Sequence, residues 1–406
     1  GPAANDIWAS TFHSACVRIL RRDIEKLGFS SSFTIYDTDD SLRVVKDCLK
    51  DLNIDEKQFP PRSVLGYISR AKDAMKLAEE YLADCERAGD FRLTKIANIY
   101  MEYQRRLWEA NALDFDDIIL HTVRLLQQFE DVREFYQKKF RYVLIDEYQD
   151  TNHLQYLLAS LLAGGYQNFC VVGDDDQSIY RFRGATIENI LSFEEQYKGC
   201  RVIRLEENYR STRHILEASN AVIRNNQGRK GKELWTRAGE GEKLHLYTAM
   251  NENDEARYVA EQVMEDYSQG RHWKDHAVLY RMNAQSNQVE QAFKRNGIPY
   301  RIIGGTRFFD RAEVKDMIAY LAVLNNPEDA LRLTRIINNP PRGIGARTVE
   351  TAQAIARRDG SSLYAVIDNA RMYPELERAA AKLAVFTNLM GELSAMLTQL
   401  TSSMRS

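Results

Sequence analysis

The chain has 406 residues, 44% of them hydrophobic and 28% charged, which is enough apolar content to bury sizeable cores in two to four domains. Its formal net charge of −3 excludes binding to nucleic acid through overall basic charge, so any DNA contact must come from local basic and aromatic groups. No apolar run reaches the roughly 20 residues that cross a bilayer, and five scattered cysteines lack metal-ligand spacing, so we expect a cytoplasmic protein with reduced thiols and no zinc site.

A helix with a polar start is predicted near the beginning of the chain. Residues 11–27 place apolar side chains at helical spacing, and Gly28 is positioned to end the helix. The first residues, Thr11 to Ser14, offer hydroxyls, a phenyl ring and the His13 imidazole at a helix start, where phosphates bind well. The alternative is that Thr11 and Ser14 only cap the helix.

An all-helical domain is predicted over residues 37–110. This stretch is rich in Lys, Glu and Asp, has few strand signals, and offers N-caps at its start in Asp37, Thr38 and Asp39. It is followed by the sequence ALDFDD, in which Asp114 can cap a further helix. Phe115, at the start of that helix, is most simply a core residue.

A strand followed by two carboxylates comes after a predicted helix over residues 131–139. Residues 142–145 form a short apolar run that is typical of a strand buried on both faces of a parallel sheet. Asp146 and Glu147 would then stand at the carboxyl end of this strand, where ligands collect. One acid could hold a divalent metal through water while the other accepts a proton from an attacking water. The alternative is an acidic turn.

Two more strands are predicted to end at the same edge. Residues 168–173, after a helix near 154–162, run into Asp174 and the acids that precede Gln177. Residues 201–205 run into polar residues that include Tyr209 and Arg210. Because a site at one edge of a parallel sheet needs several loops, this convergence favours a ligand site.

The rest of the chain first alternates and then becomes helical. The predicted elements are helix 211–223, strand 244–248, helix 254–267, strand 277–280, helix 287–296, strand 300–303, and helices over 312–324, 331–337 and 379–401. Gly304 and Gly305 mark the change from a second α/β unit to a helical region.

Three sequence blocks carry a resemblance to a known family. LIDEYQDTN (144–152), VVGDDDQSIYRFRGA (171–185) and LEENYRST (205–212) closely resemble motifs II, III and IV of the UvrD/PcrA/Rep family of superfamily 1A DNA helicases. Five further blocks follow the order of the family: TFHSACVRILRRDI (11–24), ALDFDD (112–117), VLYRMNAQSNQVEQAF (278–293), FFDRAEVKD (308–316) and NNPPRGIGARTVE (338–350).

The resemblance implies roles at a nucleotide site that takes ATP and Mg²⁺. Asp146 would bind the metal through water, and Glu147 would be the general base for the water that attacks the γ-phosphate. Gln177 would sense the γ-phosphate. Arg210 would be the arginine finger, and Tyr209 would stack on adenine.

The resemblance also implies contacts with DNA. Tyr180, Phe182 and Arg183 follow Gln177 closely, so this segment would couple the γ-phosphate to the single-stranded DNA. The family usually carries Trp where this chain has Phe182. The other positions that match the single-strand track are Thr11, His13, Phe115, Arg281 and Asn283. The turn with Gly343 and Gly345, in the sequence PPRGIG, would contact duplex DNA through backbone N–H groups at a helix start, and Arg342 and Arg347 would add charge to this contact. The alternative is a plain turn between two helices.

The fold class that follows is α/β, with RecA-like (P-loop NTPase) motor domains, both incomplete, and inserted all-helical subdomains. Residues 1–36 and 111–203 would form motor domain 1A, 37–110 helical subdomain 1B, 204–303 the first part of motor domain 2A, and 304–406 part of helical subdomain 2B. The 406 residues contain no G-x-x-x-x-G-K-[ST] sequence and nothing that matches motifs V and VI. We therefore expect a piece of a helicase that turns over ATP at no more than background.

The function expected for the parent protein is that of an ATP-dependent 3′–5′ DNA helicase in the bacterial cytoplasm and nucleoid. Its partners would be single-stranded DNA, junctions of single strand and duplex, and repair or replication proteins, with no membrane partner and an undefined oligomeric state. Three alternatives stay open: a DNA-binding piece without ATP turnover, the motor part of a helicase–nuclease subunit, and a carboxylate-rich metal nuclease.

Overall fold

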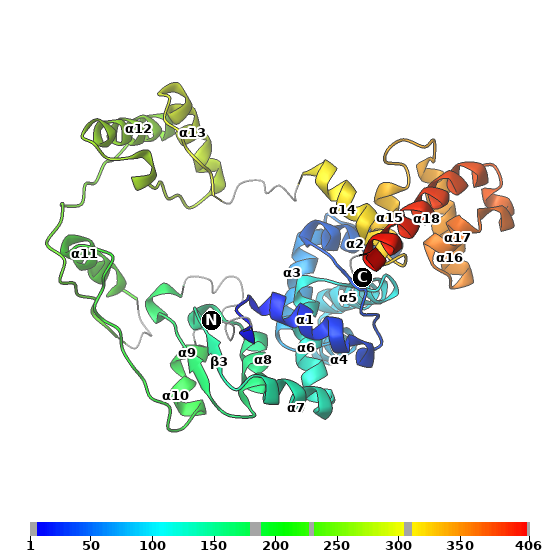
Figure 1. The fold of residues 1–406 in the computed structure, drawn as a ribbon, viewed down its shortest axis with the longest axis horizontal. Coiled ribbons are helices and arrows are strands. Elements are labelled where there is room, and N and C mark those ends of the chain that lie inside the picture. The colour runs from blue at the N-terminus through cyan, green and yellow to red at the C-terminus, as the bar shows by residue number, and fades with distance from the viewer. Residues whose placement is uncertain (1–5, 179–187, 227–230, 304–310, 404–406) are drawn as a thin grey trace. The chain divides into compact units, whose positions relative to one another are not determined.

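The computed structural model describes residues 6–178, 188–226, 231–303 and 311–403 (Figure 1). Its contacts divide the chain into two compact units, one comprising residues 1–202 with 316–406 and the other residues 203–227 with 231–315. Each unit is described by itself. Helices make up most of the first unit, whereas the second unit combines helices with long irregular segments, and none of the helices in the described ranges is long and apolar enough to span a membrane.

One part of the first unit combines the N-terminal helix α1 with helices from residues 115–196. Its elements are α1 (Phe12–Asp23), η2 (Ile24–Leu27), α6 (Phe115–Gln128), α7 (Glu130–Lys139), α8 (His153–Ala163), α9 (Glu188–Leu191) and α10 (Phe193–Gln196). The apolar stripe of α1, which includes Cys16 and Leu20, is buried against α6. Gly28 follows η2 with a φ of +88°, a conformation that glycine adopts without strain, and this confirms the predicted helix stop.

The helical character of residues 37–110 is confirmed. The helices are α2 (Thr38–Asp51), α3 (Pro61–Asp73), α4 (Ala78–Ala88) and α5 (Phe91–Glu109), and they enclose a core of their own. Asp37 begins α2 with a capping box, in which its side chain accepts from the Asp40 backbone and the Asp40 side chain accepts from the Asp37 backbone. N-capping residues and apolar residues at helical spacing therefore explain why these residues form helices.

Two short parallel strand pairs lie in the described part of the first unit. β1 (Thr34–Ile35) pairs with β2 (Ala112–Leu113), and β3 (Val143–Ile145) pairs with β4 (Phe169–Val171). The order and parallel direction of β3 and β4 agree with the sequence analysis. The prediction that residues 142–145 are buried on both faces is wrong, since Leu144 is 69% exposed. No further strand among the described residues joins this pair, so its faces stay open.

The C-terminal part of the first unit is helical, as predicted. Its elements are α14 (Ala312–Asn325), α15 (Ala330–Ile336), α16 (Ala346–Asp359), α17 (Leu363–Asp368), η9 (Ala370–Met372), η10 (Pro374–Leu376) and α18 (Ala380–Ser403). They share one core, in which Leu333, Val366, Leu383 and Phe386 are fully buried. This core is separate from the two described above.

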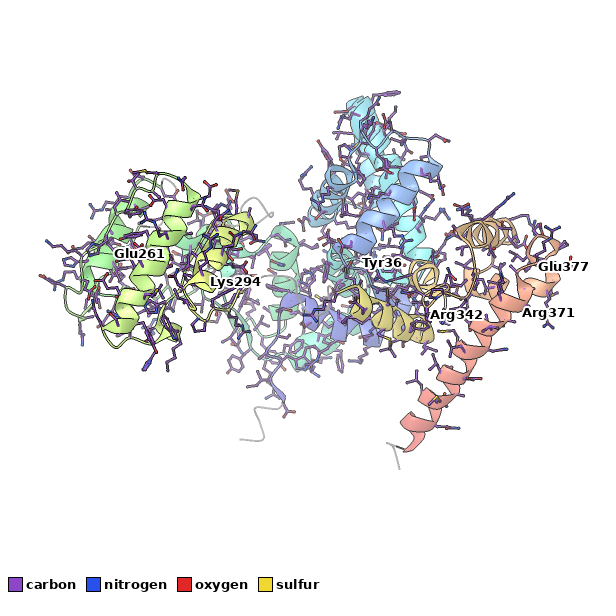
Figure 2. The ribbon with its side chains drawn as sticks, turned by 90° about the horizontal axis from the view of Figure 1, so that it is seen from above. Tyr36, Glu261, Lys294, Arg342, Arg371 and Glu377 are labelled. Carbon is purple, nitrogen blue, oxygen red and sulfur yellow. The ribbon has the colours of Figure 1, made fainter. Side chains whose placement is uncertain are left out.

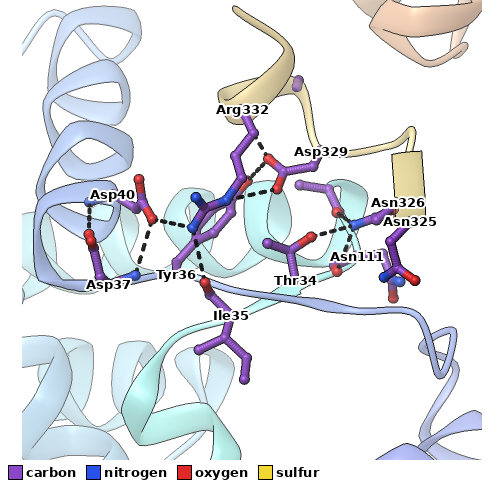
Figure 3. A network of polar contacts seen from close by, with 12 residues as sticks. Thr34, Ile35, Tyr36, Asp37, Asp40, Asn111, Asn325, Asn326, Asp329 and Arg332 are labelled. Atoms are coloured by element: carbon purple, nitrogen blue, oxygen red, sulfur yellow. Dashed lines mark hydrogen bonds and ion pairs between the residues drawn. The ribbon is translucent and has the colours of Figure 1, made fainter. Parts of the chain in front are cut away.

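A polar clamp joins the α14–α15 turn to the strands through which the chain enters and leaves the helical domain (Figure 3). Its members are Thr34, Tyr36, Asp40, Asn111, Asn326, Asp329 and Arg332. Asn326 Nδ2 donates to Thr34 Oγ1 at 3.0 Å, and Tyr36 OH donates to Asp329 Oδ1 at 2.7 Å. Since these atoms are buried, their mutual hydrogen bonds replace those with water.

The second unit has a small core between two helices. Its elements are α11 (Arg213–Ile223), α12 (Glu252–Ser268), η6 (Trp273–Asp275), η7 (Asn283–Gln285) and α13 (Ser286–Arg295). The core includes Ala260 and Val263 of α12 and Phe293 of α13. Figure 2 labels Glu261 and Lys294, which mark these two helices.

Four predicted strands are wrong. Residues 201–205, 244–248, 277–280 and 300–303 contain no strand. Their apolar side chains are largely exposed, with Leu246 at 95% exposure. A strand is stabilised by hydrogen bonds to a neighbouring strand, and none of these segments pairs with a described strand. An isolated parallel bridge between Glu207 and Trp235 joins two segments near the start of this unit.

Candidate nucleotide and single-strand sites

The end of β3 presents the two predicted carboxylates to solvent. Asp146 and Glu147 are both exposed, and Asp146 Oδ1 accepts from the Glu147 backbone N–H at 2.9 Å. Glu147 has a φ of +52°, in the left-handed region that a non-glycine residue rarely adopts. This strained turn follows β3 directly and leads into the short helix η3 (Tyr148–Asp150), so both carboxylates lie between the strand and η3.

A chain of hydrogen bonds connects Glu147 to the predicted γ-phosphate sensor. Gln149 Nε2 donates to Glu147 Oε2 at 2.7 Å, and Gln149 Oε1 accepts from the Asp174 backbone N–H at 2.9 Å. Asp174 Oδ2 in turn accepts from Gln177 Nε2 at 2.7 Å. Thus the structure brings Glu147 and Gln177 into one network.

The residue at the centre of this network, Gln149, was not predicted. It is only 1% exposed, and its amide donates to the Glu147 carboxylate through Nε2 while it accepts from the Asp174 backbone N–H through Oε1. Gly173 makes room for it, because a Cβ there would lie 2.7 Å from Gln149 Oε1. The signal in the sequence was its place in the same loop as the two acids.

The two carboxylates fit a magnesium ion that is held jointly with a nucleotide. Within the described ranges no group of three His, Cys, Asp or Glu side chains could hold a metal by itself. Mg²⁺ is usually bound by one or two carboxylates together with phosphate oxygens and water, so Asp146 with Glu147 satisfies that requirement. This donor set suits a metal that phosphate oxygens and water also hold.

An exposed aromatic edge forms where α1 and α6 begin. The His13 and Phe115 rings meet edge to face, with centroids 5.7 Å apart and planes at 85°. Phe115 is 48% exposed, so its interpretation as a core residue is wrong: it is the first residue of α6, and its ring lies beside His13. Burial lowers the pKa of His13, which favours a neutral ring beside Phe115. Thr11 caps α1, with its hydroxyl accepting from the Ser14 backbone N–H at 3.3 Å.

A buried ion cluster lies directly behind Phe115. Asp114 and Asp117 form a capping box at the start of α6. Lys72 of α3 reaches both carboxylates, with Nζ 2.6 Å from Asp114 Oδ2 and 2.8 Å from Asp117 Oδ1. Its position on the apolar stripe of α3, four residues after Ile68, could have indicated an inward side chain.

The predicted nucleotide-binding residues of the second unit lie on its surface. Tyr209 is 86% exposed, and its hydroxyl donates to Glu207 Oε2 at 3.1 Å. Arg210 is exposed, and its backbone N–H donates to Asn208 Oδ1 at 2.9 Å, which orders this turn. Arg281 and Asn283 lie before α13, and Asn283 begins η7. Tyr180, Phe182 and Arg183 lie outside the described residues.

The predicted duplex contact is a tight turn before α16. Gly343 has a φ of +68°, which favours glycine, whereas Gly345 has an ordinary φ of −78° and is the N-cap of α16. Ile344 between them is buried and anchors the turn. Only Gly343 therefore needs to be glycine on conformational grounds.

Arg342, labelled in Figure 2, is engaged within its own unit. Its guanidinium donates to the Ile336 carbonyl at 3.0 Å and to Tyr320 OH at 2.6 Å. It therefore satisfies carbonyl groups at the end of α15. Arg347, in the first turn of α16, is exposed and better placed to meet a phosphate.

Comparisons with known proteins match most of the chain. Residues 1–198 match the UvrD/REP helicase N-terminal domain, and residues 203–378 match the UvrD-like helicase C-terminal domain. The chain is 47% identical over 397 residues to the ATP-dependent DNA helicase PcrA of Bacillus subtilis, covering 98% of this chain and 53% of that protein. It is 48% identical over 371 residues to the PcrA of Staphylococcus aureus, covering 91% of this chain and 50% of that protein. The chain thus spans about half the length of the curated relatives it matches.

Proposed function

This chain belongs to the UvrD/REP helicase family, and from that premise we propose that it is part of an ATP-dependent DNA helicase that moves 3′ to 5′ on single-stranded DNA. The observation that carries the proposal is the occurrence, in one unit, of the Glu147–Gln177 network and the exposed His13–Phe115 edge. A motor of this kind needs both a phosphate site and a strand contact. The RecA-like fold of its motor domains is part of the proposal.

The proposed chemistry at the β3 edge assigns one task to each carboxylate. Asp146 would hold Mg²⁺ through water, and the ion would neutralise charge that develops on the phosphate oxygens. Glu147 would accept a proton from the attacking water. Because Gln149 fixes Glu147 Oε2, the proposal assigns that proton to Oε1. Gln177, in the same network, would hydrogen-bond the γ-phosphate.

Tyr209 and Arg210, which belong to the second unit, are also proposed to bind the nucleotide. The exposed Tyr209 ring offers a face for adenine, and the Arg210 guanidinium offers charge to the transferring phosphoryl group. Thr11, Arg281 and Asn283 are proposed to extend the strand contact. For the 406 residues alone we propose DNA binding with background ATP turnover, because they contain no G-x-x-x-x-G-K-[ST] sequence.

The strand contact is tested by single-strand affinity over a range of salt concentrations. Phe115→Ala and Phe182→Ala should each weaken binding of an oligothymidylate by about 1–3 kcal/mol and leave the salt dependence unchanged, since stacking releases no counterions. Arg183→Ala should flatten the salt dependence instead. Equal changes of slope in all three variants would contradict the assignment.

The chemistry is tested in a chain extended to the length of the curated relatives. Glu147→Gln should remove DNA-stimulated ATP hydrolysis and spare nucleotide binding, because the amide cannot accept a proton. Equal loss of both would argue against the general-base role.

The duplex contact is tested with a duplex that carries a 3′ single-stranded tail. Replacing Gly343 and Gly345 with Ala should weaken its binding and spare a bare single strand. Gly343→Ala alone should account for most of the loss, because only that position has a left-handed backbone. Unchanged affinity in a variant with a native circular dichroism spectrum would remove the contact from the proposal.

A further inference from the structure

We propose that Lys72 is a positioning residue for single-strand binding, which holds the first turn of α6 so that Phe115 stands beside His13. The inference rests on the proposed function, since it takes Phe115 to be a strand contact. Lys72 belongs to α3 of the helical domain and is completely buried, so it cannot touch a phosphate itself. Any effect of Lys72 on DNA must pass through other residues.

The hydrogen bonds around Lys72 converge on the two residues that flank the start of α6. Asp114 Oδ1 accepts from the Asp117 backbone N–H at 2.8 Å, and Asp117 Oδ2 accepts from the Asp114 backbone N–H at 3.3 Å. Lys72 Nζ contacts the remaining oxygen of each carboxylate. Tyr103 OH also donates to Asp114 Oδ2, at 2.8 Å. All four oxygens of the two carboxylates are therefore engaged, and Phe115 lies between them in the chain.

The charges of the cluster make Lys72 indispensable to its geometry. Asp114 and Asp117 are both buried, and one ammonium is shared between two carboxylates. Burial would raise the pKa of Asp114, but Lys72 holds it below its usual value, whereas burial and the Asp114 charge raise the pKa of Asp117 to about 7. Without the ammonium the two buried carboxyls lose their counterion, so either they take up a proton that changes their hydrogen bonds or the first turn of α6 moves.

Neighbouring Asp73 shows that the end of α3 fixes more than one helix start. Asp73 Oδ1 accepts from Asn152 Nδ2 at 2.7 Å. Asn152 is the N-cap of α8 and directly follows the loop that contains Asp146 and Glu147. The end of α3 thus contacts the N-caps of α6 and α8. This arrangement places the helical domain in a position to set the geometry of the strand contact.

The test is a double-mutant cycle on oligothymidylate affinity, measured by fluorescence anisotropy with the 406-residue chain. Lys72→Met should weaken binding by no more than Phe115→Ala does, which is about 5- to 150-fold. In the Phe115→Ala background, Lys72→Met should have no further effect. The salt dependence should stay that of the parent, whereas loss of a lysine that contacts phosphate would flatten it.

A matched control is Lys76→Met, which removes an ion pair with Asp84 on the exposed side of the same segment. It should bind as the parent does. If Lys72→Met proves unfolded by circular dichroism, Tyr103→Phe removes a single hydroxyl from the same cluster and should show the same non-additivity with Phe115→Ala.

The outcomes separate the inference from the function on which it rests. If Phe115→Ala binds as tightly as the parent, the proposed strand contact is wrong. If Phe115→Ala weakens binding, and Lys72→Met or Tyr103→Phe weakens it by the same factor in both backgrounds, the strand contact stands and the positioning role of Lys72 is overturned.

Discussion

The two edges of the first unit that carry the proposed sites, the His13–Phe115 pair and the carboxylates at the end of β3, are held in opposite ways. Behind Phe115, three fully or nearly fully buried charged groups fix the start of α6. At the end of β3, Asp146 and Glu147 are exposed, and the Glu147–Gln177 network has one deeply buried member, Gln149. The His13–Phe115 edge is thus held in place by buried charged groups, whereas Asp146 and Glu147 at the end of β3 depend on hydrogen bonds near the surface. Substitutions of the buried charged cluster should change stability most, and substitutions of the exposed Asp146 and Glu147 should change chemistry rather than stability.

The largest effect should come from the buried cluster. Lys72→Met should lower the free energy of unfolding by about 3–5 kcal/mol, because it leaves two buried carboxylates without their counterion. Urea unfolding followed by circular dichroism measures the change. Lys26→Met, which removes an exposed pair with Asp131, is the control and should unfold as the parent does. Similar midpoints for the two variants would remove the contrast between the edges.

The second effect tests the buried member of the carboxylate edge. Gln149→Leu should cost about 1–3 kcal/mol, because the Asp174 backbone N–H loses its acceptor. The same unfolding measurement applies, with the exposed Gln196→Ala as control. A parent-like midpoint for Gln149→Leu would mean that the network does not order this edge.

The third effect is a pH dependence beside the buried cluster. Burial and Arg124 lower the pKa of His121 to about 3, so this ring is neutral when folded and gains a proton on unfolding below about pH 6.5. Stability from His121 is therefore present above pH 6.5 and decreases by about 1 kcal/mol between pH 6.5 and 5.5.

Two nearby carboxyls act in the opposite direction. Burial raises the pKa values of Asp73 and Asp117 to about 7, so these groups stabilise the folded protein as the pH falls below 7. The contribution of His121 is isolated by subtracting the pH profile of His121→Leu from that of the parent. A flat difference between pH 6.5 and 5.5 would show that the ring is not kept neutral.

The smallest effect should come from the exposed acids. Asp146→Asn and Glu147→Gln should leave the free energy of unfolding within about 0.5 kcal/mol of the parent, because both side chains are exposed. Thermal or urea unfolding measures this directly. A loss comparable to that of Lys72→Met would show that the carboxylate edge is also part of the structural core.

Much of the helical fold could be predicted because its signals are local. Asp37 and Asp114 cap helices within three residues of themselves, and Gly28 ends one with its own backbone. Strands depend on partners elsewhere, so the apolar pattern at residues 244–248 could not predict their exposed, unpaired state. The helices that carry the site were therefore predictable, and the extent of the sheet was not.

The candidate site was predictable in its residue types but not in its supports. The sequence around Glu147 and Gln177 indicated the phosphate chemistry, and the network that joins them agrees with their placement at one edge. Gln149 and Lys72 were missed because a polar side chain is usually exposed, and only tertiary contacts show that these two are buried.

The polar clamp of Figure 3 sets an order of events for a refolding chain. Thr34 and Asn326 are 292 positions apart, and Tyr36 and Asp329 are 293 apart, whereas the caps of α2 and α6 close over three positions. Contacts so distant in sequence form late, since a long loop must close before they stabilise anything. We expect the helices α14 to α18 to gather around their own core first and to dock on the N-terminal helices as the final, slowest step.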